Sequence, residues 1–341
     1  MKISFFLIAC SFFGHFWSTE GQAQILGNSG GGWSIRGTDP IEILYDGKQV
    51  TNYESGYDAG KPYFYPIIGP TGENMTRHWP MNEDFADEAR DQIHHRGLWY
   101  GLGNVNGFDF WHPAGDETQK DRAFGVIVHR GLNGVSIKGQ TLTLRTKSDW
   151  VQAANREKRV CSDRREFTLF YREDGSLVID LTLTLLADAG EVIIVDDKDG
   201  AWAIRPLPTL RLKGKVAKGH CVNSERITDA EVSGNRASWV DVSGPDRAGN
   251  PVGIAMLDHP TNPRYPAWWI AEDSGFFAAN PFGQGKLEKD ALETAGQYTI
   301  PNGESVTFRY RTIFHSGDTS AAKIAEAFEA FSAKGSKEGK E

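Results

Sequence analysis

Cysteine, basic patches and long apolar runs are scarce in this sequence. Three cysteines occur among 341 residues, too few for a cysteine-rich zinc or iron–sulfur site. After the N-terminal segment, no apolar run is long enough to span a membrane. Acidic and basic residues are well mixed, and the net charge is −8. We therefore expect no membrane span and no nucleic-acid partner.

Several signatures of catalysis and cofactor binding are also missing. The sequence has no Gly-x-Ser-x-Gly elbow, which argues against a serine hydrolase. Gly101-Leu102-Gly103 does not complete a dinucleotide fingerprint. The histidine pairs of common metal motifs are absent, so we expect neither a metal nor another cofactor. A metal hypothesis would use His78, His94 or His95, His112 and one carboxylate.

The N-terminus has the features of an export signal. Lys2 is followed by the mostly apolar residues 3–17, and Gly21-Gln22-Ala23 has small residues at the spacing of a signal peptidase site. Residues 1–23 are therefore predicted to be a signal peptide of a periplasmic or secreted protein. Leu7-Ile8-Ala9-Cys10 also resembles a lipobox, which would make Cys10 a lipid anchor. The apolar residues that continue past Cys10 favour the signal peptide.

Apolar and polar residues alternate along most of the mature chain, which predicts strands. An Asp46-Gly47 turn joins residues 41–45 to 48–50, and a turn around Asp174-Gly175 joins 166–171 to 176–185. Further strands are expected at 191–195, 252–257, 268–270 and 305–314. This spacing predicts an all-β fold, a large twisted antiparallel β-sandwich.

One segment near the C-terminus has a helical period. Thr319 or Ser320 is predicted to cap a helix that continues to about residue 333. Its apolar face would consist of Ile324, Ala325, Phe328 and Phe331. Residues 334–341 are rich in lysine, glutamate and glycine and are predicted to be a disordered tail.

The sequence contains no internal repeat and no proline- or serine-rich linker. Residues 24–333 are therefore predicted to form a single domain. Cys161 and Cys221 lie within it. Export permits a disulfide between them, but the sequence is equally compatible with two separate thiols.

Residues 91–113 hold the densest group of polar and aromatic side chains. Four glycines make this segment poor material for a core element, whereas a loop lining a concave site suits it. His94 and His95 are adjacent, so in an extended segment they point to opposite faces unless the backbone turns there. Asp109 and Trp111 should share one face of a strand, with Asp109 as base or hydroxyl acceptor and Trp111 as stacking platform.

Other candidate residues lie in distant loops. Arg77 is suited to holding a carboxylate, a phosphate or vicinal hydroxyls, and His78 to moving a proton. Alternatively, Arg77 pairs with the acidic residues 83–88 and His78 packs on Trp79. Asp258-His259 follows a predicted strand and suits general base chemistry.

These segments together resemble an exported bacterial family, PmoA-like, commonly labelled "methane oxygenase PmoA". The resemblance implies a galactose-mutarotase-like supersandwich and, because such proteins occur among sugar-processing proteins, a carbohydrate or glycan ligand. It spans nearly the whole mature chain, through residues 67–72, 77–80, 94–101, 105–111, 197–200, 237–241, 258–264 and 277–283.

The function predicted from the sequence is an exported carbohydrate-active protein. We expect an enzyme of acid/base chemistry on a sugar or sugar derivative, as an epimerase, lyase or hydrolase. The alternatives are a non-catalytic glycan-binding module and the metal-dependent oxygenase that the family label suggests. The predicted catalytic residues are His95, His94, His78 and His259. The predicted substrate-binding residues are Arg77, Arg96, Trp99, Asp109, Trp111, Arg264 and Asn280.

Overall fold

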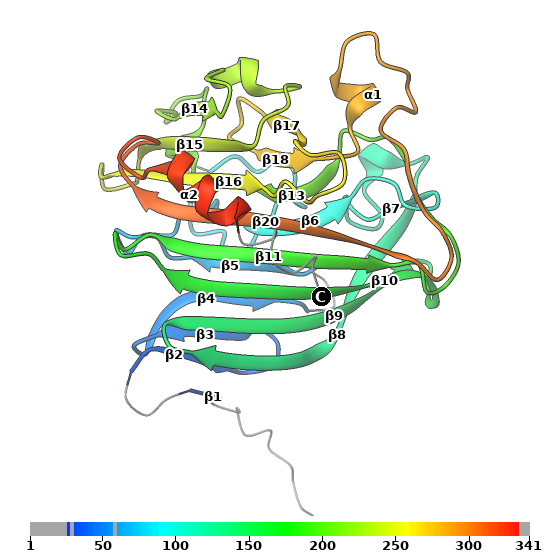
Figure 1. Cartoon of the computed structure of the whole chain (residues 1–341), viewed down its shortest axis with the longest axis horizontal. Coiled ribbons are helices and arrows are strands. Elements are labelled where there is room, and N and C mark those ends of the chain that lie inside the picture. The colour runs from blue at the N-terminus through cyan, green and yellow to red at the C-terminus, as the bar shows by residue number, and fades with distance from the viewer. Residues whose placement is uncertain (1–25, 28–30, 57–59, 87, 334–341) are drawn as a thin grey trace, which may run out of the picture.

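The computed structural model describes residues 26–27, 31–56, 60–86 and 88–333. The predicted signal peptide, Cys10 and the C-terminal tail lie outside this part of the chain. Within it, two nine-stranded sheets pack face to face, and a two-stranded ribbon lies beside them (Figure 1). No helix of the described residues is long and apolar enough to cross a membrane. The predicted all-β sandwich is confirmed.

The first sheet combines the N-terminal strands with strands from later in the chain. Its order is β1 (Leu26–Gly27), β2 (Trp33–Arg36), β3 (Ile41–Tyr45), β4 (Lys48–Glu54), β5 (Tyr63–Ile67), β6 (Leu98–Leu102), β13 (Gly200–Ile204), β18 (Phe277–Asn280) and β17 (Trp268–Ala271).

The second sheet contains the longest strands. Its order is β14 (His220–Asn223), β15 (Trp239–Pro245), β16 (Pro251–Asp258), β20 (Ser305–Ser316), β11 (Leu177–Leu186), β10 (Asn155–Tyr171), β9 (Thr141–Gln152), β8 (Ala123–Lys138) and β7 (Phe108–Asp109). These neighbours are antiparallel except β7 and β8, which are parallel. The ribbon pairs β12 (Val192–Ile194) with β19 (Tyr298–Ile300).

Short helical elements lie between the strands. They are the 3₁₀ turns η2 (Glu117–Gln119), η3 (Pro208–Leu210) and η4 (Asp229–Val232) and the helices α1 (Gln284–Leu287) and α2 (Ile324–Ser332).

The predicted hairpins form where their turn residues allow. Asp46 and Gly47 both have positive φ, 50° and 74°, as a two-residue turn between antiparallel strands requires. The turn joins β3 to β4, as predicted. β11 buries Leu177, Ile179 and every second residue after it between the sheets, as its alternating pattern predicts.

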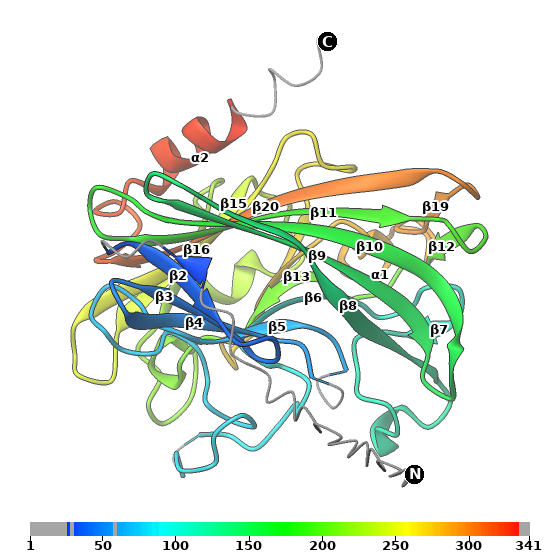
Figure 2. The ribbon, with the colours of Figure 1, turned by 90° about the horizontal axis from the view of Figure 1, so that it is seen from below.

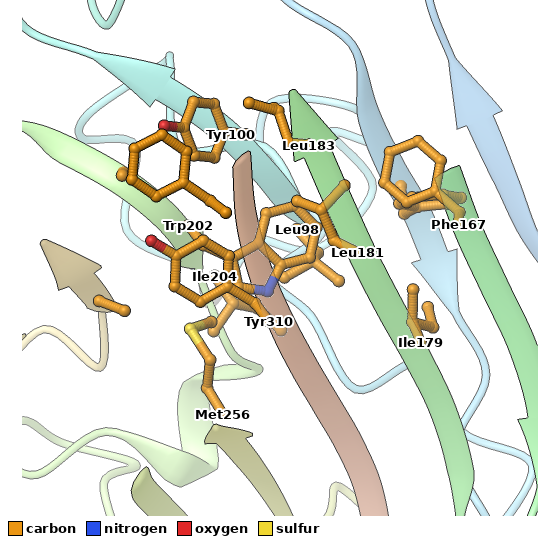
Figure 3. Packing of buried hydrophobic residues seen from close by; sticks show 14 of the residues in the cluster. Leu98, Tyr100, Phe167, Ile179, Leu181, Leu183, Trp202, Ile204, Met256 and Tyr310 are labelled. Carbon is orange, nitrogen blue, oxygen red and sulfur yellow. The ribbon is translucent and has the colours of Figure 1, made fainter. Parts of the chain in front are cut away.

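The core lies between the two sheets. Figure 3 shows Trp202 and Leu98 of the first sheet packed with Leu181 and Tyr310 of the second. The rings of Trp202 and Tyr310 stack with centroids 6.5 Å apart. Each fully buried apolar side chain of this kind stabilises the fold by about 1.5–3 kcal/mol. The main core cluster joins side chains from Trp33 of β2 to Phe314 of β20.

The C-terminal helix packs on the outer surface of the second sheet. In Figure 2 it lies on the side opposite the loops of the first sheet. The predicted cap at Thr319 or Ser320 is wrong, because α2 begins at Ile324 with Lys323 at the cap position and the Thr319 hydroxyl donates to Asp241. Ile324 and Phe331 are buried as predicted, but Ala325 is exposed and Ala327 takes its place.

Cys161 and Cys221 do not form a disulfide. Both are free thiols at 0 % exposure. Burial raises the pKa of both thiols, so neither has the character of a reactive thiolate.

Candidate active site on the first sheet

The outer face of the first sheet, turned away from the second sheet, carries its own buried cluster. Trp99 of β6, Ala203 of β13 and Ala278 of β18 project to this face and pack with Phe276. Loops 68–97 and 110–122 supply the polar side chains that surround this cluster. The candidate site is therefore outside the main core, where polar groups do not have to fit between two apolar layers.

A backbone turn brings His94 and His95 together. Gln92 has a φ of 42°, and the His95 N–H donates to the Gln92 carbonyl oxygen at 3.0 Å. The two imidazole rings lie with centroids 4.4 Å apart. The turn that the sequence analysis required for a common site is therefore present. It leads into β6 through Gly97, where a Cβ would lie 1.9 Å from the Phe64 carbonyl oxygen, so only glycine fits.

Arg77 holds this turn in place. Its guanidinium is 0 % exposed and donates to the Asp91 carboxylate at 2.5 Å and to backbone carbonyls, including those of Gln92 and His95. Burial, with the nearby Arg205, lowers the pKa of Arg77 to about 10. The prediction that Arg77 holds substrate is wrong, because its guanidinium is buried and both terminal nitrogens donate to the loop that carries the histidines.

Arg205 determines how His95 is presented. Its Nη1 lies 3.2 Å from His95 Nδ1, and its Nη2 donates to both Asp91 oxygens at 3.2 Å. A guanidinium can only donate, so Nδ1 accepts and the proton of the neutral ring is on Nε2. Burial, with His94 and Arg205, holds the pKa of His95 well below its ordinary value. His95 is therefore a neutral imidazole with a defined N–H donor.

His95 is packed against two aromatic rings that also contact each other. It stacks on Phe276 at 4.4 Å and on Trp99 at 5.3 Å between centroids. The ring is 5 % exposed. These contacts fix the plane of the imidazole, so the direction of its Nε2–H bond is set by the fold.

His112 reaches the same cluster from a different loop. Its ring centroid lies 4.4 Å from that of His94, and its Nδ1 donates to Asp109 at 2.9 Å. One ligand atom from each of His94, His112 and Asp116 lies within 4.8 Å of the other two. Two imidazoles and a carboxylate are a common donor set for a divalent transition metal.

Asp109 ends strand β7 and organises the residues that follow. Its carboxylate accepts from the backbone N–H groups of Trp111 and His112 at 2.8 and 3.0 Å. The prediction that Asp109 and Trp111 share a strand face is therefore wrong, because the chain turns after Asp109 to satisfy the carboxylate. Burial raises the pKa of Asp109, but the hydrogen bonds from His112 outweigh it and the net shift is downward.

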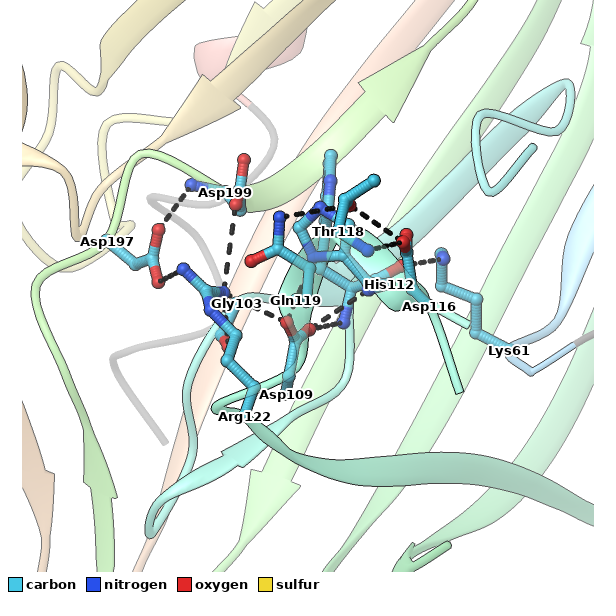
Figure 4. A network of polar contacts seen from close by, with 11 residues as sticks. Lys61, Gly103, Asp109, His112, Asp116, Thr118, Gln119, Arg122, Asp197 and Asp199 are labelled. Atoms are coloured by element: carbon cyan, nitrogen blue, oxygen red, sulfur yellow. Dashed lines mark hydrogen bonds and ion pairs between the residues drawn. The ribbon is translucent and has the colours of Figure 1, made fainter. Parts of the chain in front are cut away.

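Arg122 joins Asp109 to two further carboxylates, as Figure 4 shows. It donates to Asp109 at 2.9 Å and lies 3.4 Å from Asp197 and 3.9 Å from Asp199. Burial and the neighbouring Asp197 raise the pKa of Asp199 to about 6. Three carboxylates thus share one guanidinium beside His112.

Lys61 is a buried cation that the sequence analysis missed. Its ammonium donates to the Trp111 carbonyl oxygen at 2.5 Å and lies 5.9 and 5.7 Å from the ring centroids of Trp99 and Trp111. Burial and the charge of Arg96 lower the pKa of Lys61 to about 7. The preceding Gly60 and following Pro62 mark only a loop, so no sequence signal placed Lys61 near the histidines.

Trp99 and Trp111 do not form an open stacking platform. Each is 1 % exposed, and their ring centroids lie 5.4 Å apart. The role predicted for them as sugar-stacking rings is therefore wrong in this structure. They contact the imidazole rings of His94 and His95 and the ammonium of Lys61.

Three predicted binding residues remain. Arg96 is accessible to a ligand, whereas Arg264 and Asn280 hold backbone carbonyls of the fold. Arg96 is half-buried, donates through Nε to the Ile93 carbonyl oxygen and lies 5.9 Å from the Tyr63 ring. Arg264 donates to backbone carbonyls of residues 295 and 297. Asn280 is 0 % exposed and donates to the carbonyls of residues 197 and 198. Only Arg96 fits the predicted role of holding a substrate oxygen.

His78 and His259 make their contacts elsewhere. The His78 ring stacks on Phe85 at 3.6 Å, and its Nδ1 lies 2.8 Å from the Tyr65 hydroxyl. His259 packs against Phe331 of α2, on the second sheet. The structure therefore brings His94 and His95 together but does not bring His259 to them.

The sequence gives indications of different strength for the residues that complete the cluster. Asp116 follows His112 by four residues through a Pro-Ala-Gly turn, a spacing that indicates convergence in a loop. Arg205 follows a buried strand, and Asp91 begins the segment that the sequence analysis singled out. Phe276 reaches the cluster from the β17–β18 hairpin, and only tertiary structure shows that.

Comparisons with known proteins support no specific activity. A family of unknown function, DUF6807, matches residues 40–329, and no curated protein matches the chain. A galactose mutarotase-like protein from Clostridium acetobutylicum is similar at 9 % identity and a TM-score of 0.36, over 83 % of this chain and 95 % of that one.

Two further solved structures are similar over comparable lengths. An aldose epimerase homologue from C. elegans has 9 % identity and a TM-score of 0.28, over 87 % of this chain and 100 % of that one. The 4-alpha-glucanotransferase from Thermococcus litoralis has 10 % identity and a TM-score of 0.27, over 86 % of this chain and 39 % of that one. Likenesses this low carry no argument about substrate or reaction.

Proposed function

The chain belongs to the family of unknown function DUF6807, and we propose that it is an exported carbohydrate-active enzyme that moves a proton on a sugar or sugar derivative. The observation that carries this proposal is the convergence of three imidazoles, His94, His95 and His112, from two loops on one face of a sheet. Groups held this closely are typical of proton-transfer sites. The signal-like N-terminus supports export.

We assign to His95 the stabilisation of the negative charge that develops on a substrate oxygen when the proton is moved. Arg205 on Nδ1 and the rings of Trp99 and Phe276 fix its position, so its Nε2–H bond has one direction. A neutral imidazole of this kind donates a hydrogen bond to a substrate oxygen and stabilises the charge that develops there. Arg96, which is half-buried beside the turn, is suited to hold a second oxygen.

Sugars match the polar character of the cluster. Imidazole N–H groups, a guanidinium and carboxylates pair with hydroxyl groups as donors and acceptors. The burial of Trp99 and Trp111, at 1 % exposure each, removes the stacking surface on which the glycan-binding alternative depended. Enzymatic proton transfer is therefore the function that the geometry supports best.

The test is proton exchange on a panel of sugars. Purified protein is incubated in D₂O with neutral sugars, keto sugars and uronic acids, and deuterium incorporation and new products are followed by NMR. We expect one class of sugar to exchange a C–H proton or to form a product, and His95→Ala to lower the rate by roughly a hundredfold or more.

His220→Ala is the matched control. His220 is an exposed histidine paired with Asp229, and its substitution should leave the rate unchanged. An unchanged rate in His95→Ala would remove the assigned role of His95. Saturable sugar binding with no exchange and no product across the panel would identify a glycan-binding module and overturn the proposal.

A further inference from the structure

His112 is held in the orientation that is usual for a metal-binding histidine. Its Nδ1 donates to Asp109, so Nε2 is the nitrogen left for a ligand. A carboxylate that holds the second nitrogen is the usual outer partner of a metal-bound histidine, since it fixes the tautomer and makes the ligand more basic. Asp109 is itself held by Arg122 and by two backbone N–H groups. The orientation of His112 is therefore built in.

Asp116 is oriented by the start of η2. One of its carboxylate oxygens, Oδ1, accepts from the Thr118 N–H at 2.9 Å and from the Thr118 hydroxyl at 2.7 Å. These bonds leave the other oxygen, Oδ2, for a ligand. Asp116 is half-buried.

His94 is the least satisfied member of the cluster. It is 6 % exposed, its side chain makes no hydrogen bond to any residue that the structure describes, and its Nδ1 is buried without a partner. Buried polar atoms are almost always paired, and an unpaired one costs about 1–3 kcal/mol. The His94 ring thus retains the capacity to bind something that the chain itself does not supply.

The carboxylates around His112 and Asp116 favour a cation there, whereas Lys61, Arg77 and Arg205 place positive charge near His94. The network in Figure 4 contains four carboxylates, those of Asp109, Asp116, Asp197 and Asp199, and two cations, Lys61 and Arg122. Its formal charge is therefore −2 when all six groups are ionised. Lys61 is a nearby positive charge, but its ammonium is directed at the Trp111 carbonyl oxygen.

We propose that His94, His112 and Asp116 bind a divalent transition-metal ion and that Asp109 positions His112 for it. This is the one group of three such side chains with ligand atoms within 4.8 Å among residues 31–56, 60–86 and 88–333. The proposal departs from the sequence expectation of no metal, because Asp116 and His94 meet only in the folded chain. Two imidazoles and one carboxylate fit zinc with an open coordination position, or ferrous iron or manganese.

The proposed metal site extends the proposed function, and the catalytic role of the metal rests on that function. An ion at this position lies beside His95 and has open coordination positions suited to a sugar oxygen. There it would act as a Lewis acid on the same substrate to which His95 donates. Binding of the ion itself is independent of any sugar and can be measured without a substrate.

The test is metal binding by the full mature chain. Protein treated with a chelator is titrated with zinc and, without oxygen, with ferrous and manganous ions by calorimetry. Cobalt(II) serves as a spectroscopic probe of imidazole ligation. We expect one ion per chain and an affinity at least about a hundredfold lower in His94→Ala, His112→Ala and Asp116→Ala. Asp109→Asn should lower it by about 10–100-fold, as substitution of an outer partner does.

Controls separate binding from folding and from catalysis. His220→Ala should bind the ion as the wild type does, and circular dichroism of the metal-free variants checks that each is folded. Absence of stoichiometric binding, or binding that survives both His94→Ala and His112→Ala, overturns the metal site. Full sugar turnover in chelator-treated protein would overturn its catalytic role while the proposed function stands. If the protein binds the metal but acts on no sugar, the proposed metal site stands and the proposed function is overturned.

Discussion

Two buried histidines of this molecule have opposite surroundings. His315 of β20 is 0 % exposed and lies with its Nε2 2.9 Å from Asp241, and its Nδ1 donates to the Ser316 carbonyl oxygen at 3.2 Å. His94 is nearly as buried but has no hydrogen bond to any described residue. Folding satisfies His315 completely and leaves the hydrogen-bonding capacity of His94 unused. A buried imidazole stabilises the protein in the first setting and is available to a ligand in the second.

The largest expected effect tests this difference directly. His315→Ala should lower the free energy of unfolding by about 2–3 kcal/mol more than His94→Ala does, because it leaves Asp241 buried without its charged partner. Both substitutions remove a ring of the same size, so the cavity contributions are similar. Urea denaturation of metal-free protein measures the difference. Equal losses would show that pairing does not distinguish the two histidines.

A second effect concerns the positioning of His95. Arg205→Met removes the donor on His95 Nδ1 and should lower kcat by about tenfold to a hundredfold with little change in KM, because the imidazole loses its fixed orientation. Arg205→Lys retains a cationic donor and should restore part of the rate. A purely structural role for Arg205 predicts instead that both variants lose stability and rate together, which thermal melts would show.

The smallest expected effect is a loss of stability at rising pH, which His315 carries and His94 does not. Burial alone would lower the pKa of His315, but the charge and hydrogen bond of Asp241 raise it overall. The folded protein then holds a proton that the unfolded chain releases. The stabilisation is complete below about pH 6.5, the value of an unfolded histidine, and is lost as pH rises through the raised pKa.

Denaturation at a series of pH values measures this dependence. Lys61, whose pKa is lowered to about 7, acts in the opposite direction at higher pH, so each variant is compared with the wild type. The extra stability of the wild type over His315→Ala should fall as pH rises above about 6.5, and its extra stability over His94→Ala should not. Asp258, whose pKa burial raises to about 7, lowers stability as pH rises from roughly 4 to 7. Its contribution begins at lower pH and should remain in both variants. An extra stability over His315→Ala that does not fall with rising pH would contradict the assignment.

Local patterns predicted most of the fold. The Asp46-Gly47 hairpin, the alternation along β11 and the long strand β20 each depend on residues close in sequence, so their signals survive without knowledge of partners. The start of α2 was misplaced because the Thr319 hydroxyl, a good helix cap in isolation, donates to Asp241 instead. Tertiary hydrogen bonding overrode a local preference.

The sequence by itself determined that this is a β-sandwich and that residues 91–113 hold a dense group of polar and aromatic side chains, because strand period and loop composition are local properties. Only the tertiary structure decided which side chains meet. In the folded chain Arg77 donates to the loop that carries the histidines, and Trp99 and Trp111 are buried. His94 lies beside His112 and Asp116. Such contacts join residues from separate loops, and their geometry depends on how the sheets stack, which no local pattern records.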